Sequence, residues 1–458
     1  MVVNKKSSKS SKKRGSNLAP QEHDLQNALR LIFAHEQQME HPPEIEAELP
    51  AIITHWLHNT SVEPLVLGAD QGREWSQLLH NFSTMDFKKG VPILRSSRKP
   101  ARSVICNSAP FHEQREKAAF TFIDLFAGIG GFRLGLQKLS GQCLFSSEWE
   151  SHAKDTYFNN FGEIPFGDIH FFTDSTLSHV GIDSIPDHDI LCGGFPCQPF
   201  SQAGNGLGFD DTRGTLFFEI LKITKKKKPK ALFLENVKRF KNHDKGRTFN
   251  LVRETLNELG YTVYAQVLSA MDFGLPQKRE RFFIVAFKDA IQFEFPKPES
   301  NPAIKIKQIL EKKVDPSFTI TDRMWEGHQL RREKHRARGN GFGFSLFDPD
   351  DIATNTISAR YWKDGSEALI SQKSKNPRTL TPRECARLQG FPDEFILNSS
   401  KRHAYQQFGN SVPVPLIQKI GENILRALKV KKPLKIPTVV KSELGLKDKR
   451  LSKRGKKI

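Results

Sequence analysis

Cysteine is scarce in this chain, with only five among 458 residues, spread widely and without CxxC spacing. An odd number without paired spacings argues against both a disulfide framework and a zinc module, and fits a reducing, intracellular compartment. The sequence also lacks an apolar run of about 18 residues, and its basic N-terminus has no apolar signal-peptide core. We therefore expect a cytoplasmic protein with no membrane partner.

Acidic residues are fewer than basic ones, 51 Asp and Glu against 70 Lys and Arg, for a formal net charge of +19. Such an excess indicates a polyanionic partner, with nucleic acid first among the candidates. Part of the charge lies in Lys-rich ends that cannot bury a core. We expect basic tails at residues 1–20 and 429–458, and there the charge could serve solubility alone.

The composition divides the remaining chain into four regions. Residues 21–117 combine a helical pattern with a Pro- and Arg-rich linker, and read as an accessory region. Strand and helix patterns alternate over residues 118–288, which predicts an α/β fold with a mostly parallel sheet flanked by helices. The alternation fails over residues 289–377, which indicates a smaller inserted domain. Residues 378–428 return to the first domain and close in an amphipathic helix.

A glycine turn after the first α/β strand is the first chemical signal. In "DLFAGIGG", Gly128 and Gly130 allow the backbone to approach a ligand at a helix N-terminus. Glu148 follows twenty residues later, where dinucleotide-binding folds place an acid on the ribose hydroxyls. Arg133 replaces the third glycine of that fingerprint, which disfavours NAD and leaves room for an adenosyl ligand. An ordinary tight turn and a surface acid remain the alternative.

The second signal is "GFPCQPFSQAG", which follows an apolar strand pattern. A Pro-fixed turn at a strand's carboxyl end makes Cys197 a candidate nucleophile, against the alternative of an ordinary buried cysteine. The apolar strand "ALFLENV" ends at Glu235, whose carboxyl is a candidate for a raised pKa and for donating a proton to a ring nitrogen. A helix cap or a loop acid is the plainer reading of Glu235.

In "QKRER", Gln277, Arg279 and Arg281 are spaced by two before a strand, so they would share one face. These side chains would either line the same site or form a solvent-exposed strand edge without a role in it.

Taken together and in order, "DLFAGIGG", "SEW", "GDI", "GFPCQPFS", "ENV", "QKRER" and "GNSV" resemble the DNA (cytosine-5) methyltransferase family. The likeness covers residues 120–428 and is greatest to bacterial Dcm-like members of restriction-modification systems. It implies a Rossmann-like S-adenosylmethionine-dependent methyltransferase domain with a smaller target-recognition domain at residues 289–377. It also implies S-adenosylmethionine as methyl donor and no metal.

The resemblance implies roles for individual residues. Cofactor contacts would come from Phe126, Gly128, Gly130, Glu148, Trp149, Asp168, Ile169 and Asn410, the last also supporting the returning helix and the cysteine loop. Cys197 would attack C6 of a flipped cytosine while Glu235 hydrogen-bonds N3, and Arg279 and Arg281 would lie beside the base. Further substrate contacts would come from Pro196, Gln198, Ser201 and Gln202.

Sequence specificity would lie in the inserted domain. Its base-reading candidates are Arg338, Asn340, Thr356, Arg360 and Tyr361, and a target site beginning CC follows only by analogy. The implied partners are double-stranded DNA and a restriction endonuclease that cuts the same site, with the enzyme acting as a monomer. Two alternatives remain: an RNA cytosine-5 methyltransferase, and an inactive homologue that only binds DNA.

Overall fold

The computed structural model describes a large part of the chain, with gaps. Several predictions fall outside it, namely the two basic tails, the greater part of residues 21–117, and the loop that contains Cys197, Gln198, Ser201 and Gln202. The described residues are 43–58, 85–86, 91–92, 109–111, 118–177, 180–196, 216–298, 304–341 and 343–429.

A six-stranded sheet forms the centre of the fold, in the order β4-β3-β5-β6-β9-β7. Four neighbouring strands are parallel, and β9 runs antiparallel to both β6 and β7. This confirms the predicted α/β fold with a mostly parallel sheet. The strands are β3 (Phe120–Leu125), β4 (Gly141–Ser147), β5 (Ile190–Gly194), β6 (Ala231–Val237), β7 (Thr262–Ser269) and β9 (Glu280–Phe287).

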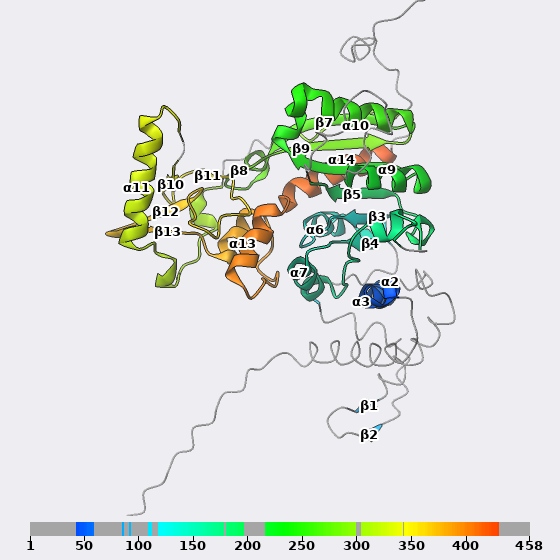
Figure 1. Cartoon of the computed structure of the whole chain (residues 1–458), viewed down its shortest axis with the longest axis horizontal. Helices are drawn as coiled ribbons and strands as arrows, with labels where there is room; N and C mark the ends of the chain where they lie inside the picture. Colours follow the sequence, from blue (N-terminus) through cyan, green and yellow to red (C-terminus); the bar gives the residue numbers. More distant parts are fainter. Residues whose placement is uncertain are drawn as a thin grey trace, which may run out of the picture.

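Helices cover both faces of this sheet, because each strand presents apolar side chains on both sides. One face packs against α3 (Leu49–His58), α8 (His170–Thr173), α9 (Leu216–Lys227) and α10 (Arg247–Glu258). The other face packs against α6 (Gly131–Gln137) and α14 (Val414–Lys429). Figure 1 shows α14 returning along the sheet after α13, as the amphipathic pattern after "GNSV" predicts.

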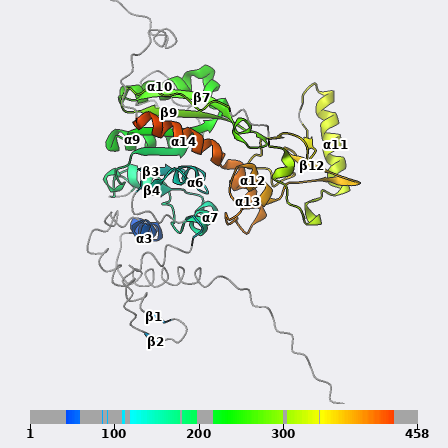
Figure 2. The same ribbon diagram turned by 180° about the vertical axis from the view of Figure 1, so that it is seen from behind.

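A second group of elements lies to one side of the large sheet in Figures 1 and 2. It contains a three-stranded sheet, β10-β12-β13, and a parallel pairing of β11 with β8. Its helix α11 is 16 residues long and buries only His328, so its apolar pattern was too weak to predict it. The elements are β8 (Gln277–Lys278), α11 (Asp322–Ala337), β10 (Leu346–Phe347), β11 (Thr354–Asn355), β12 (Leu369–Gln372), β13 (Lys375–Arg378), α12 (Pro382–Leu388) and α13 (Lys401–Asn410).

The remaining elements are short or connect these layers. No helix among the described residues is both long and apolar enough to cross a membrane. The remaining helices and strands are α2 (Pro43–Glu46), β1 (Met85–Asp86), β2 (Val91–Pro92), α7 (Ser151–Phe161) and the 3-10 helices Ile182–Ser184, Lys238–Gly246, Ala270–Phe273, Ile306–Gln308 and Pro316–Phe318.

The contact between α6 and α14 depends on a glycine. A Cβ at Gly135 would lie 2.7 Å from Cγ2 of Ile417, closer than side chains pack. The two helices therefore approach each other more closely than an alanine at this position allows. This contact holds the C-terminal helix against the helix that begins at the glycine turn.

Replacing a glycine inside a helix by alanine usually raises the free energy of unfolding, but at Gly135 we expect the opposite. We expect Gly135→Ala to lower the free energy of unfolding by roughly 1–3 kcal/mol, because overpacking displaces α14. The matched control is Gly327→Ala in α11, where no neighbouring atom lies within 4 Å of the added Cβ. That variant should gain up to about 1 kcal/mol from helix propensity. Urea-induced unfolding of both variants measures this, and shifts of the same sign would contradict the packing argument.

Candidate active site

The predicted motifs meet at one edge of the sheet. Leu125 pairs with both Ser147 and Gly193, and Gly194 pairs with Glu235, so the carboxyl ends of four parallel strands finish side by side. This is the edge at which open α/β sheets bind their ligands. The glycine turn, the acid after β4, the start of the cysteine loop and the acid of β6 are thus neighbours.

The glycine turn leaves its backbone open to a ligand. Gly128 and Gly130 have φ of +55° and +83°, and Phe126 also has a positive φ of +56°. A non-glycine residue in that region is held at a cost of about 1–3 kcal/mol, a strain that tends to mark functional sites. Within the described part of the chain, no atom lies within 4 Å of where a Cβ of Gly128 would be.

Glu148 ties this turn to the next strand. Its carboxylate accepts hydrogen bonds from the backbone N–H of Gly128 at 2.8 Å and of Glu150 at 2.9 Å. Burial raises the pKa of Glu148, and these two N–H groups oppose that rise. Beside it, the Trp149 indole is 82% exposed, which leaves a flat apolar surface at the mouth of the site.

The "GDI" segment lies against the same turn. The backbone N–H of Glu148 donates to the carbonyl of Phe166 at 2.7 Å, which fixes the segment beside β4. Ile169 is buried, whereas Asp168 is exposed and hydrogen-bonds the ring of His170 at 2.6 Å. An open backbone, an acceptor carboxylate and an exposed indole together fit an adenosyl group.

Arg133, at the place of the missing third glycine, points into the protein. Its guanidinium is buried, donates to Glu163 at 2.7 Å and to the Tyr157 hydroxyl at 3.0 Å, and lies over the ring of Phe161. The side chain therefore fills the space behind the turn and does not face the ligand. This accounts for the departure from the dinucleotide fingerprint.

Glu235 and Arg281 form an ion pair at the end of β6. Arg281 Nε lies 2.9 Å from Glu235 Oε1, with side-chain exposures of 13% and 11%. Burial raises the pKa of Glu235, and the charges of Arg281 and Arg279 oppose that rise without cancelling it. A Cβ at Gly194 would lie 3.2 Å from Glu235 Oε2. The chain that leads into the cysteine loop therefore passes directly beside this carboxyl.

Asn236 is a residue of this site to which the sequence assigned no role. Its Nδ2 donates to the carbonyl of Phe195 at 3.0 Å, and its Oδ1 accepts from the Val237 N–H at 2.8 Å. The side chain is 2% exposed. Asn236 thus anchors the backbone two residues before Cys197, next to the exposed Pro196. Its place beside Glu235 in "ENV" was the available signal.

The burial of "QKRER" follows the predicted alternation, since Gln277 and Arg279 are buried whereas Lys278 and Glu280 are exposed. Arg279 is buried and donates to the carbonyls of Ile357 at 3.2 Å, Gly409 at 2.9 Å and Ser411 at 2.5 Å. Gln277 is buried as well and binds backbone groups of Ile357 and Leu388. Of the three, Arg281 forms the ion pair with Glu235, and the charge of Arg279 also opposes the rise in the pKa of Glu235.

Arg279 is therefore a clamp on three backbone carbonyls in this structure, and its expected place beside the base stays a prediction. It holds the backbone on both sides of Asn410, which is exposed at the end of α13. The predicted cofactor contact of Asn410 stays a prediction.

The base-reading candidates differ in exposure. Arg338 and Arg360 are exposed. Asn340 is hydrogen-bonded to the His335 ring at 2.8 Å, and Thr356 donates to the Lys278 carbonyl at 2.7 Å. Tyr361 is 1% exposed, with its hydroxyl bonded to Ala368 and Leu380, so its proposed contact with a base is wrong.

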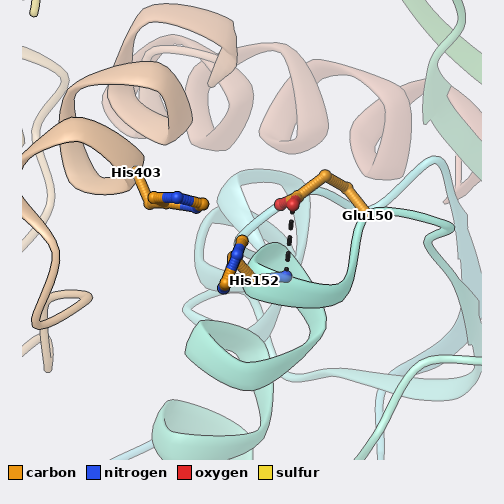
Figure 3. A group of neighbouring side chains, drawn as sticks. All are labelled: Glu150, His152 and His403. Atoms are coloured by element: carbon orange, nitrogen blue, oxygen red, sulfur yellow. Dashed lines mark hydrogen bonds between the residues drawn. The ribbon is translucent and has the colours of Figure 1, made fainter.

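Within the described residues, one group of side chains has the composition of a metal site. The ligand atoms of Glu150, His152 and His403 lie within 4.8 Å of one another, at the start of α7 and on α13 (Figure 3). The Glu150 carboxylate already accepts from the N–H groups of His152 at 3.2 Å and Ala153 at 2.7 Å. Its observed role is to cap α7, beside two imidazole rings packed edge to face.

Sequence comparison finds relatives that align with more than two thirds of this chain. Type II methyltransferase M.DsaV of Dactylococcopsis salina is 54% identical over 314 residues, covering 68% of this chain and 87% of that protein. Type II methyltransferase M.HhaI of Haemophilus parahaemolyticus is 41% identical over 334 residues, covering 70% of this chain and 98% of that protein.

Structural comparison agrees on the fold. The crystal structure of S. pombe Dnmt2 methyltransferase matches with a TM-score of 0.54 and 21% identity, covering 68% of this chain and 99% of that one.

The family model for C-5 cytosine-specific DNA methylase matches residues 120–426. These matches confirm the resemblance seen in the ordered motifs. The chain belongs to the C-5 cytosine-specific DNA methylase family.

Proposed function

We propose that this chain is a site-specific DNA (cytosine-5) methyltransferase of a Type II restriction-modification system. The observation that carries the proposal is the buried Glu235–Arg281 pair, beside the backbone that leads into Cys197. Methylation of cytosine C5 in DNA is the activity of the family. The assignment of individual residues below is the proposal.

The cofactor residues would bind S-adenosylmethionine at the glycine turn. When bound, S-adenosylmethionine supplies a methyl group made electrophilic by its sulfonium charge. Glu148, whose carboxylate lies at the glycine turn, would accept from the ribose hydroxyls, and the exposed Trp149 indole would lie against the adenine. Asp168 and Ile169 would bind the adenine edge, while Phe126, Gly128 and Gly130 keep the backbone close to the ligand.

The catalytic residues would act on a cytosine flipped out of the duplex, because C6 is unreachable in stacked DNA. The Cys197 thiolate would add to C6 as the C5–C6 π bond breaks, and Glu235 would donate a proton to N3. The displaced electron pair then forms a C4–C5 enamine that is nucleophilic at C5. C5 would then take the methyl group, and the bond between that methyl and the sulfonium sulfur breaks to leave a neutral thioether. Loss of the C5 proton and expulsion of the thiolate restore the double bond and release 5-methylcytosine.

Arg281 would hold the base as well as Glu235. Its Nε binds Glu235 and its Nη1 binds the carbonyl of Glu280, and no other described residue accepts from Nη2. An N–H of Nη2 is therefore the candidate donor to the carbonyl oxygen on C2 of the cytosine. Pro196, Gln198, Ser201 and Gln202 would contact the substrate from the cysteine loop.

Residues 118–288 and 378–428 would form the catalytic domain, and residues 289–377 the target-recognition domain. Arg338 and Arg360 are the exposed candidates for base contacts, and the net charge of +19 favours double-stranded DNA. The enzyme would act as a monomer in the cytoplasm, where its DNA lies, with an endonuclease that cuts the same site.

Neither alternative function gains support from a specific observation. The relatives cited are named Type II methyltransferases, and the Dnmt2 likeness, at 21% identity, concerns the fold alone. An inactive homologue would have no need of the set Cys197, Glu235 and Arg281, which is complete in this chain.

Expression in a host without DNA methylation tests the function directly. We expect 5-methylcytosine at one short motif with the wild type, and none with Cys197→Ser, because a hydroxyl is a far weaker nucleophile at neutral pH. Genome-wide bisulfite sequencing reads both strains. If both strains contain folded protein and neither contains 5-methylcytosine, the proposal is contradicted. RNA is then the next substrate to test.

Substituting the two arginines of "QKRER" one at a time should change kcat in one variant and the free energy of unfolding in the other. We expect Arg281→Lys to lower kcat about 100-fold or more, since a donor at the reacting base is lost, with little change in unfolding. Arg279→Lys should instead lower the free energy of unfolding by about 1.5–3 kcal/mol, because one ammonium cannot replace a guanidinium bound to three carbonyls. Steady-state kinetics and urea unfolding of both variants measure this. The reverse assignment of effects would refute the clamp.

Methyl transfer should need no added metal. The sulfonium activates the methyl group and Cys197 activates the base, so the proposed steps require no Lewis acid. We expect the rate to be unchanged after dialysis against EDTA, and unchanged again in His403→Ala, which removes one side chain of the group in Figure 3. A loss of activity with EDTA that zinc restores in the wild type alone would overturn this expectation.

A further inference from the structure

The segment at residues 43–58 precedes the region matched by the family, yet it is part of the core. Ala51, Ile52 and Ile53 on α3 are fully or almost fully buried, in one cluster with Phe145 and Phe166. Figure 1 shows α3 lying beside the β4 edge of the sheet. This position brings a segment outside the matched region next to the cofactor side of the fold.

Polar contacts fix α3 along that edge. His55 hydrogen-bonds the Ala51 carbonyl through Nδ1 at 2.9 Å, and its Nε2 accepts from the N–H of Ser146, in β4, at 3.1 Å. Thr54 Oγ1 accepts from the N–H of Ile164 at 2.9 Å. Because β4 is an edge strand, its outward N–H groups need such partners. The contacts continue from β4 into the segment that carries "GDI".

Glu48 makes the last contact of this series. Its two carboxylate oxygens lie 3.1 and 3.0 Å from the backbone N of Gly167 and accept its single N–H. A Cβ at Gly167 would lie 2.5 Å from Glu48 Oε1, so the carboxylate occupies the space that a side chain would take. The next two residues are Asp168 and Ile169, the proposed adenine contacts.

We infer that Glu48 is a positioning residue for S-adenosylmethionine, holding the Gly167 backbone so that Asp168 and Ile169 meet the adenine. The inference rests on the proposed function. Burial raises the pKa of the Glu48 carboxyl, and the N–H of Gly167 and the charge of Lys154 oppose that rise. A half-buried hydrogen bond from a backbone N–H to a carboxylate restricts the segment that donates it, and its loss frees that segment to move.

The effect should fall on cofactor binding and leave the chemical step unchanged. Glu48 contacts the loop beside β4, whereas Glu235 and Arg281 lie at the end of β6, across β3 and β5 in the sheet. Removing the carboxylate therefore weakens a contact made equally in the ground and transition states. Such a change raises KM and spares kcat.

The test uses the full-length protein with Glu48→Ala, Glu48→Gln and, as a matched control, Glu46→Ala, whose side chain is exposed. We expect Glu48→Ala to raise the Kd for S-adenosylmethionine, measured by calorimetry without DNA, about tenfold. KM for the cofactor should rise in parallel at constant kcat. Glu48→Gln should restore binding because its amide oxygen still accepts from Gly167, and Glu46→Ala should match the wild type.

A second variant protects the test against misfolding. Gly167→Ala leaves α3 intact and displaces the carboxylate, so it should reproduce the loss of affinity. Unchanged Kd in Glu48→Ala and Gly167→Ala, or a fall in kcat at constant KM, would overturn the inference. A wild type that binds no S-adenosylmethionine would instead overturn the proposed function, so the two failures are distinguishable.

Discussion

The parallel hydrogen bonding of β4, β3, β5 and β6 is the constraint on which the site depends. In this register the strands end together, so four loops that are distant in sequence open at the same edge. These strand ends contribute an open backbone, an acceptor carboxylate, the segment that leads to Cys197 and a buried acid. A shift of β5 by one residue would move Gly194 away from Glu235 and separate the entry of the cysteine loop from the acid.

The parts of the site that follow directly from local sequence could be predicted. Gly128 and Gly130 were expected to let the backbone approach a ligand in a turn, and both have the positive φ that favours glycine. Glu235 ends an apolar strand, so its burial and raised pKa follow from its place in the sequence. The alternation of strand and helix patterns likewise predicted the sheet, because both periodicities are local properties of the chain.

The parts that depend on distant partners could not be predicted. Nothing local in "QKRER" shows that Arg279 will meet carbonyls more than 70 residues away. Tyr361 looked like a recognition residue by type, but its hydroxyl is used to join two backbone segments of the core. The packing of α3 on β4 was missed for the same reason: its partners, such as Ser146, lie about 90 residues further along the chain.

The Arg279 clamp has a consequence for how this fold tolerates change. Its guanidinium holds Ile357, Gly409 and Ser411 through carbonyl oxygens, which every amino acid possesses. The hydrogen bonds themselves therefore make no demand on those three side chains, but packing does: a Cβ at Gly409 would lie 2.4 Å from the backbone of Ser358 and Ala359, and Ile357 is fully buried. Of the three positions, Ser411 is the one where a change of side chain would leave both the guanidinium bond and the core packing in place. The joint between the large sheet and the smaller group of elements is therefore constrained by the fit of Gly409 and Ile357 rather than by the identity of the groups that accept from Arg279.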